Sequence, residues 1–316
     1  MRTLTKLLFF SIALFSALSN SAAVDTITGG QALIDNDTIV SSNEMYELGF
    51  FSPGNSKNRY LGIWFKKIYP QTVVWVANRE TPLTGTKGVL RVNSNGMLLL
   101  FSGNNTMICS TDQDFIWQSF DYPTDTLLAG MKFGKDLVTG LDRHLTSWKS
   151  MDDPSPGLYV SWMDTNGYPQ AFERRGSVLR LRFGPWTGVS SIMSRVYLTP
   201  EGNEMRLNYI DPTQGWMPYL VTTVDMCTQY GLCGAYGICN INTSPACTCT
   251  EGFQPRYPVQ WNAGNWSGGC KHEKPLNCGN ANGFKKLSGV KLPDTRHSWY
   301  DQLNKKLQPL QEHSSF

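Results

Sequence analysis

The sequence lacks the ligand spacings that structural zinc sites require. Its 8 cysteines include no C-x-x-C pair, and its 4 histidines include no H-x3-5-H pair. Tetrahedral zinc sites usually take their ligands from such pairs. The residues therefore predict no metal site and no cofactor. The histidines are His144, His272, His297 and His313.

Known catalytic motifs are also absent. The chain contains no G-x-S-x-G turn, no H-E-x-x-H pair and no P-loop, and the kinase glycine loop, H-R-D and D-F-G motifs are missing. Acidic residues are spread along the chain, so no carboxylate pair stands out for acid–base chemistry. The sequence therefore predicts no catalytic residues and a protein that is not an enzyme.

Long hydrophobic runs are scarce. The longest, Leu7 to Leu18, is too short to cross a bilayer. Arg2 and Lys6 precede it and the small residues of 21–23 follow, which is typical of a secretory signal peptide cleaved after Ala23. We expect a secreted protein with no membrane span, in an oxidising compartment where disulfides persist.

Charge of either sign is not in excess. The chain has 28 Lys and Arg against 25 Asp and Glu, a net charge of +3, and loss of Arg2 and Lys6 would bring it to about +1. A balance of this kind gives no general attraction to nucleic acid or to anionic membranes.

Sustained helical periodicity is missing as well. Short apolar runs alternate with turns, and Asn95-Gly96 is a strong hairpin signal because both residues tolerate positive φ. The pattern therefore predicts a mainly β protein. The first expected strands lie at 45–51, 60–65, 72–77, 89–92 and 97–101.

Four N-x-S/T sequons occur in a chain that is expected to be secreted, so we predict glycan attachment and an exposed position for each. They begin at Asn36, Asn104, Asn242 and Asn265.

A further strand is expected at 177–183. Leu179, Leu181 and Phe183 would share one face, and Arg180 and Arg182 the other. Such an arginine face is usually solvated. The alternative is a surface that binds an acidic peptide.

Six cysteines follow the pattern C-x5-C-x5-C-x7-C-x-C-x20-C. Six cysteines allow fifteen pairings, and a module this small needs disulfides because it buries little apolar surface. Two cysteines stand outside the cluster. Cys109 is expected to be a buried free thiol, with an intermolecular disulfide as the alternative. Cys278 is free, mispaired or linked to another chain.

Several stretches resemble plant S-locus glycoproteins and the ectodomains of bulb-type (G-type) lectin S-receptor-like kinases. They are 30–65, T-V-V-W-V-A-N-R-E-T-P-L at 72–83, 117–170 and G-P-W-T-G at 184–188. The resemblance implies a β-prism of three small sheets, then a second β-rich domain, an EGF-like module and a PAN/apple remnant. The expected divisions are a signal peptide (1–23), a shortened bulb-type lectin domain (24–116), a shortened S-locus domain (117–222), an EGF-like module (223–270), a partial PAN/apple domain (271–301) and an unrelated tail (302–316).

The EGF-like resemblance implies a first-to-third, second-to-fourth and fifth-to-sixth pairing. The implied disulfides are Cys227–Cys239, Cys233–Cys247 and Cys249–Cys270.

The mannose-binding motif of lectin relatives, Q-x-D-x-N-x-V-x-Y, is degenerate here. Its positions hold Asn93, Asn95, Met97, Leu99 and Phe101. The carboxylate and the phenol are lost, and a site without those polar partners should discriminate sugars poorly.

The resemblance implies an extracellular recognition protein of the plant apoplast or cell wall. Its partners would be a peptide or protein ligand, or a glycan, with a homodimer or a receptor kinase as further partners. The implied role is recognition of pollen in self-incompatibility or perception of an extracellular signal. Two alternatives stay open: a mannose-binding lectin, and a non-functional or decoy product of a truncated receptor kinase gene. The segments after Cys109 and after Gly188 are shorter than in those relatives, and the tail at 302–316 matches nothing in the family pattern, which favours the latter.

Overall fold

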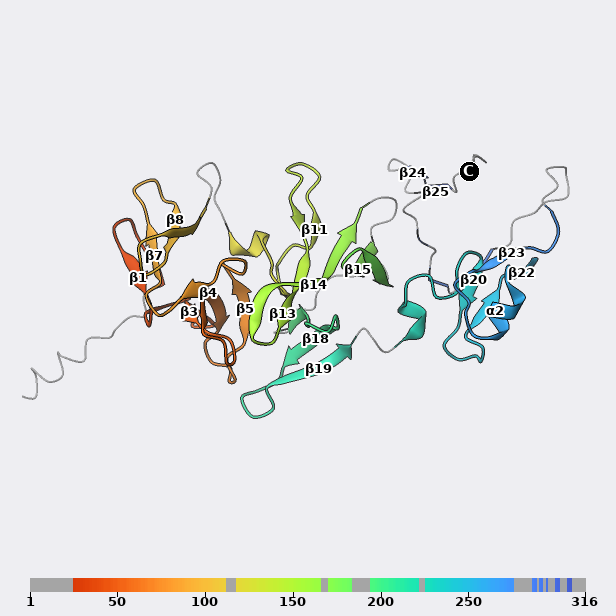
Figure 1. Cartoon of the computed structure of the whole chain (residues 1–316), viewed down its shortest axis with the longest axis horizontal. Helices are drawn as coiled ribbons and strands as arrows, with labels where there is room; N and C mark the ends of the chain where they lie inside the picture. Colours follow the sequence, from red (N-terminus) through yellow and green to blue (C-terminus); the bar gives the residue numbers. More distant parts are fainter. Residues whose placement is uncertain are drawn as a thin grey trace, which may run out of the picture. The chain divides into compact units, whose positions relative to one another are not determined.

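The structure is a computed structural model, and it describes residues 25–111, 118–165, 170–183, 194–221 and 225–275, with short pieces (286–288, 290–291, 294, 299–301 and 306–308) nearer the C-terminus. Strands dominate, as predicted, and the chain divides into two compact units, 1–116 and 117–316 (Figure 1). Within these residues, no helix is both long and apolar enough to cross a membrane.

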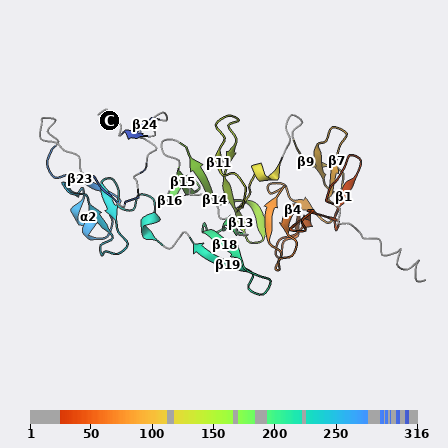
Figure 2. The same ribbon diagram turned by 180° about the vertical axis from the view of Figure 1, so that it is seen from behind.

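The first unit contains two antiparallel sheets. One has the order β1-β7-β8-β9, and the other has the order β2-β3-β4-β5 with β6 paired to β4. Figure 2 labels β1, β7 and β9 of the first sheet and β4 of the second. The strands are β1 (Ala32–Ile34), β2 (Thr38–Val40), β3 (Tyr46–Phe51), β4 (Asn58–Phe65), β5 (Val73–Val76), β6 (Leu83–Thr84), β7 (Val89–Val92), β8 (Leu98–Phe101) and β9 (Met107–Ser110).

Both sheets contribute to one apolar core in this unit. Leu33, Leu90 and Leu100 are cross-strand neighbours on three successive strands and are almost fully buried. Leu61 and Phe50 of the other sheet complete the cluster with Leu83. Burying such side chains stabilises a fold by roughly 1.5–3 kcal/mol each, so this cluster holds the two sheets together.

Two buried polar residues link the strands of the first unit. Asp35, in the turn after β1, pairs with Arg59 on β4. The Asn78 side chain accepts a hydrogen bond from the Leu61 backbone N–H at 2.8 Å and donates to the Thr81 carbonyl at 3.0 Å. Asn78 therefore supplies backbone partners where the β5 ladder ends.

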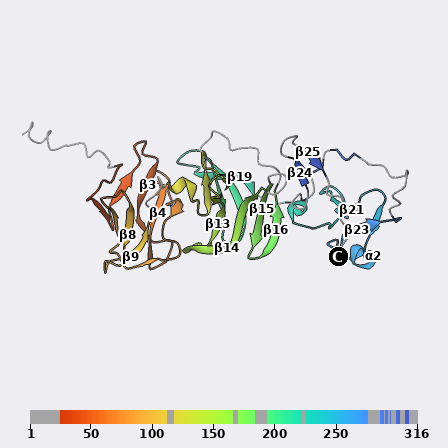
Figure 3. The ribbon, with the colours of Figure 1, turned by 90° about the horizontal axis from the view of Figure 1, so that it is seen from above.

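The second unit begins with two further sheets. Their orders are β13-β14-β15-β16 and β10-β17-β18-β19, and β11 pairs with β12 in a small hairpin. Figure 3 shows the strands of the first of these sheets side by side. Leu127, Leu145, Val196 and Leu198 come from both sheets and form the core. The strands are β10 (Thr126–Leu128), β11 (Gly134–Lys135), β12 (Asp142–Arg143), β13 (Leu145–Ser150), β14 (Asp153–Asp164), β15 (Gln170–Arg175), β16 (Val178–Arg182), β17 (Ser194–Leu198), β18 (Glu204–Tyr209) and β19 (Trp216–Val221).

A small cysteine-rich region follows. Its strands form two-stranded pairs, β20 with β21 and β22 with β23, and the five-residue helix α2 lies between the latter two in sequence. A last hairpin joins β24 and β25. The elements are β20 (Gly237–Cys239), β21 (Cys247–Cys249), β22 (Phe253–Pro255), α2 (Pro258–Asn262), β23 (Cys270–His272), β24 (Trp299–Asp301) and β25 (Lys306–Gln308).

The prediction that Arg180 and Arg182 share one face is wrong. The register between β15 and β16 shifts between Glu173 and Arg174, so Arg180 is an extra residue in a β-bulge. Arg180 donates to the Glu173 carboxylate at 3.0 Å, whereas Arg182 donates to the Gln170 side chain at 2.7 Å. The two arginines, and the leucines on either side of Arg180, therefore lie on opposite faces.

The prediction of a buried thiol at Cys109 is also wrong. Cys109 is a free, exposed cysteine, although partial burial still raises its pKa. It lies directly opposite Leu100, which is in the core. β9 is the outermost strand of its sheet. An edge strand has a neighbouring strand on one side only, so the Cys109 side chain is exposed to solvent on the other side.

Candidate recognition surfaces

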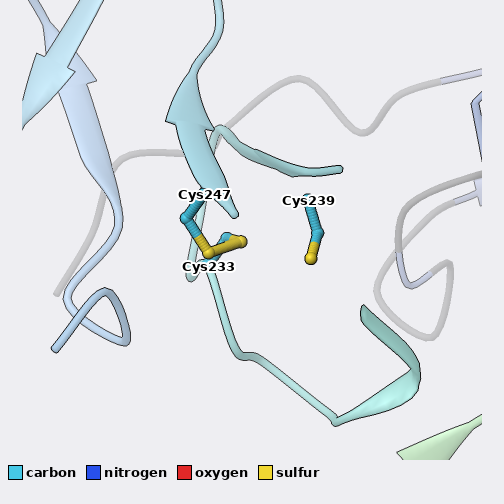
Figure 4. A group of neighbouring side chains, drawn as sticks. All are labelled: Cys233, Cys239 and Cys247. Carbon is cyan, nitrogen blue, oxygen red and sulfur yellow. A yellow bond between two sulfur atoms is a disulfide. The ribbon is translucent and has the colours of Figure 1, made fainter. Parts of the chain in front are cut away.

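The cysteine cluster is a set of three disulfides. They join Cys227 to Cys239, Cys233 to Cys247 and Cys249 to Cys270, the same pairs that the EGF-like resemblance implies. The sulfur atoms of Cys233, Cys239 and Cys247 lie within 4.8 Å of one another (Figure 4), an arrangement that could suggest a metal site. Metals bind the thiolate form of cysteine, and these sulfur atoms are all engaged in disulfides.

Two glycines let the backbone cross itself beside these disulfides. A Cβ at Gly234 would lie 2.5 Å from the Gly269 backbone nitrogen, and both residues have positive φ. The crossing brings the Cys270 N–H within 2.7 Å of the Ala235 carbonyl. Only glycine fits both positions without strain, so these two residues position the Cys249–Cys270 bridge.

The degenerate sugar motif lies on a hairpin turn and on β8. The Asn93 side-chain oxygen accepts hydrogen bonds from the backbone N–H groups of Asn95 and Met97, both at 2.9 Å. The Phe101 ring lies 5.8 Å from the Arg91 guanidinium. Asn93 thus stabilises the turn that Asn95-Gly96 predicted, and on the strand beyond it Phe101 carries no hydroxyl where the motif has tyrosine.

An exposed arginine pair occupies the end of the β15–β16 hairpin. Arg174 and Arg175 are exposed, and neither makes an ion pair within the described part of the chain. Each guanidinium lies near an aromatic ring, at 5.8 Å from Trp162 for Arg174 and 6.0 Å from Tyr159 for Arg175. Contact with a ring face restrains a guanidinium. One Arg174 nitrogen donates to the Gly176 carbonyl at 3.4 Å, and the other N–H groups can bind a carboxylate.

The sequence pattern did not single out this pair, because it drew attention to Arg180 and Arg182. Those two are partly buried, and both already donate hydrogen bonds to side chains of β15. Arg180 donates to the Gly202 carbonyl as well as to Glu173. The signal that could have found the exposed pair is the R-R-G turn, since residues next to a hairpin turn are the most accessible ones of a sheet.

The segment near residue 291 returns to the same sheet. The Lys291 ammonium donates to the Arg182 carbonyl, and the Tyr230 hydroxyl donates to the Asp294 carboxylate at 2.7 Å. Burial lowers the pKa of Lys291 to about 8, with the Arg182 charge acting in the same direction and Asp225 opposing. These contacts cover the outer edge of β16.

All four sequon asparagines are exposed, at Asn36, Asn104, Asn242 and Asn265. Several expectations fall outside the described residues: the signal peptide, the 184–188 motif and Cys278.

Comparison with known protein families gives two matches. The S-locus glycoprotein domain matches residues 171–257, and the D-mannose binding lectin family matches residues 72–114 and 110–149. These define the class: a protein in which lectin-family sequence, running from the first unit into the second, is followed by an S-locus domain.

Individual relatives extend the match along the chain. S-locus-specific glycoprotein S6 of Brassica oleracea is 35% identical over 362 residues, covering 94% of this chain and 82% of the relative. S-locus-specific glycoprotein BS29-2 of Brassica oleracea var. alboglabra is 34% identical with the same coverage. The chain therefore belongs to the S-locus glycoprotein family.

Receptor kinases are also similar. Receptor-like serine/threonine-protein kinase SD1-8 of Arabidopsis thaliana is 34% identical over 92% of this chain, which spans only 42% of that relative. The match covers the ectodomain of such kinases and no kinase domain. The alignment with S6 runs over 362 residues, more than the 316 of this chain, so that relative carries segments that this chain lacks.

Proposed function

We propose that this protein recognises an extracellular peptide or protein ligand, and that the end of the β15–β16 hairpin is part of the binding surface. The observation that carries the proposal is that Arg174 and Arg175 are both exposed, lie near an aromatic ring and have no acidic partner in the described residues. The two arginines are consecutive residues of β15 and point to opposite faces of the hairpin end, so each would bind its own carboxylate through charge-assisted hydrogen bonds.

The family supports the wider role. Relatives named S-locus-specific glycoproteins cover most of this chain. We propose that the role is recognition of pollen in self-incompatibility or perception of another extracellular signal. Secretion through the signal peptide of 1–23, glycans at the four sequons, and a homodimer or receptor kinase as partner belong to the same proposal.

The second unit is the proposed recognition unit because the sugar motif of the first unit has lost its polar partners. Met97 and Phe101 stand where the motif has asparagine and tyrosine, and the Asn93 side-chain oxygen already accepts hydrogen bonds within the turn. A binding site discriminates between ligands mainly through the polar side chains that hydrogen-bond one ligand and are left unpaired by another. Mannose binding is therefore the weaker of the two hypotheses.

The test is a binding titration with the disulfide-intact chain secreted from an insect-cell host. The probes are a ten-residue glutamate-rich peptide and the matched glutamine-rich and lysine-rich peptides, at two salt concentrations. Replacing Arg174 and Arg175 together by alanine should weaken binding of the acidic peptide at least tenfold, about 1.4 kcal/mol.

The matched control is R91A, because Arg91 is another exposed arginine near a ring, in the first unit. R91A should leave the affinity unchanged. Equal losses in R91A and in the double variant would show a general charge effect, and no binding of the acidic peptide by the wild type would remove this surface from the proposal. A glycan array tests the mannose hypothesis on the same preparation.

A further inference from the structure

Two carboxylates occupy the interior between the sheets of the second unit. Glu173 on β15 and Ser161 beside it on β14 are fully buried, at 0% exposure. Glu204 on β18 of the other sheet is also buried, and Ser161 donates to its carboxylate at 3.5 Å. Both acids therefore enter one interior, which the apolar side chains of Leu145 and Leu181 border in register.

Positive charge reaches this interior from two arginines. Arg180, on the bulge of β16, lies 3.0 Å from Glu173, and Arg206, on β18, lies 3.6 Å from Glu204. The second carboxylate oxygen of Glu173 accepts no hydrogen bond from the described residues. A buried anionic oxygen without a donor is costly, whereas a protonated carboxyl group is tolerated there.

The other groups that face Glu173 add no further positive charge and no donor to its second carboxylate oxygen. Tyr159, on β14, stacks on Arg180 at 5.0 Å, and the Gly202 carbonyl accepts from that same arginine. Ser161 is neutral. Two carboxylates and two partly exposed arginines thus share the site, and the interior favours a state in which one acid is neutral.

We propose that Glu173 and Glu204 form a proton-binding site in the core of the second unit, and that uptake of a proton there stabilises the packing of its two sheets. The proposal does not depend on the proposed ligand. It makes the unit a pH-sensitive structure, most stable in mildly acidic surroundings and looser as the pH rises above neutrality.

The direction in which pH changes the stability of this unit follows from the pKa shifts. Burial raises the pKa of Glu173 from its ordinary value of 4.5 to about 7, the Arg180 charge opposes this rise, and the Glu204 charge adds to it. Burial also raises the pKa of Glu204. A raised pKa in the folded state means that the folded state holds the extra proton. The stabilisation is therefore complete below the pKa of the unfolded chain, about 4.5, and is lost as the pH rises through about 7.

The test is the thermal and chemical unfolding of the whole secreted chain between pH 5 and pH 8. We expect the folding equilibrium constant of the second unit to fall on the order of 10²-fold across this range, with a matching fall in Tm. Hydrogen exchange followed by mass spectrometry on β14 and β15 peptides assigns the change to this unit.

Two isosteric variants separate the site from other groups. E173Q should reduce the pH slope by more than half, and E173Q/E204Q should remove nearly all of it, because glutamine carries no titrating proton. E201Q is the matched control, since Glu201 is exposed in the turn before β18, and it should keep the slope of the wild type.

The wild type alone can overturn the proposal. A stability that stays constant or increases from pH 5 to pH 8 would refute it, even if E173Q does not fold. A slope that persists unchanged in a folded E173Q would also refute it. Carbon-13 NMR of the glutamate side chains in the wild type gives a direct reading, and two ordinary titrations near pH 4.5 would contradict the proposed site.

Discussion

The ion pair between Asp35 and Arg59 offers a sharp test of how the first unit is held together. The Arg59 Nε donates to one carboxylate oxygen of Asp35 at 3.2 Å, and a second guanidinium nitrogen contacts the other oxygen. The Asp35 side chain is 3% exposed and the Arg59 side chain 17%. Asp35 follows β1 in one sheet, and Arg59 lies on β4 of the other. The pair therefore joins the two sheets directly.

The expected magnitude follows from this burial. Removing one member leaves the other charge buried without its partner, which costs about 3–5 kcal/mol. D35L and R59M should each destabilise the first unit by an amount in that range. The double variant should cost much less than the sum, because an apolar pair of similar size leaves no orphaned charge.

The assay is a double-mutant cycle read by native-state hydrogen exchange on the β4 and β7 peptides of the whole chain. The control is E44A, which removes the partner of Lys67 in an exposed ion pair at 2.8 Å. Exposed pairs contribute little, so E44A should leave exchange unchanged. Single variants that cost under about 1 kcal/mol, or a double variant whose cost equals the sum, would refute the reasoning.

Three further outcomes follow from contacts in the structure. N78A should destabilise the first unit by roughly 1–3 kcal/mol, because it leaves the Leu61 N–H buried without its acceptor; urea unfolding gives the value, and no change would contradict the role given to the amide. Replacing Cys249 and Cys270 by serine opens a loop of sequence separation 21 and should cost about 3 kcal/mol, measured by unfolding with the other bridges verified by peptide mapping. Cys109 should react with iodoacetamide in the folded, non-reduced chain, faster above pH 8 because its pKa is raised, and an inert thiol would contradict its exposure.

Local signals predicted much of the fold. The Asn95-Gly96 pair gave the turn between β7 and β8, and the expected strand at 89–92 coincides with β7. Turn residues and alternation act over a few neighbours, which is why they can be read from the sequence. The disulfide pairs came from family resemblance, since six cysteines alone leave the pairing open.

The candidate recognition surface was predicted only in part. The sequence indicated an arginine-rich hairpin, but it assigned the exposed role to Arg180 and Arg182 in place of Arg174 and Arg175. One residue of bulge reverses every side chain beyond it. The position of a bulge depends on the partner strand, and alternation within one strand cannot reveal it.

The sequence by itself determined the strand-rich class, the cysteine framework and the lack of known catalytic motifs. Tertiary structure alone decided which polar groups are buried. Glu173 stands beside two exposed arginines in sequence, yet its side chain is fully buried and faces the interior that also holds Glu204 of another sheet. Burial is a property of the packed sheets, since it depends on neighbours that are distant in sequence.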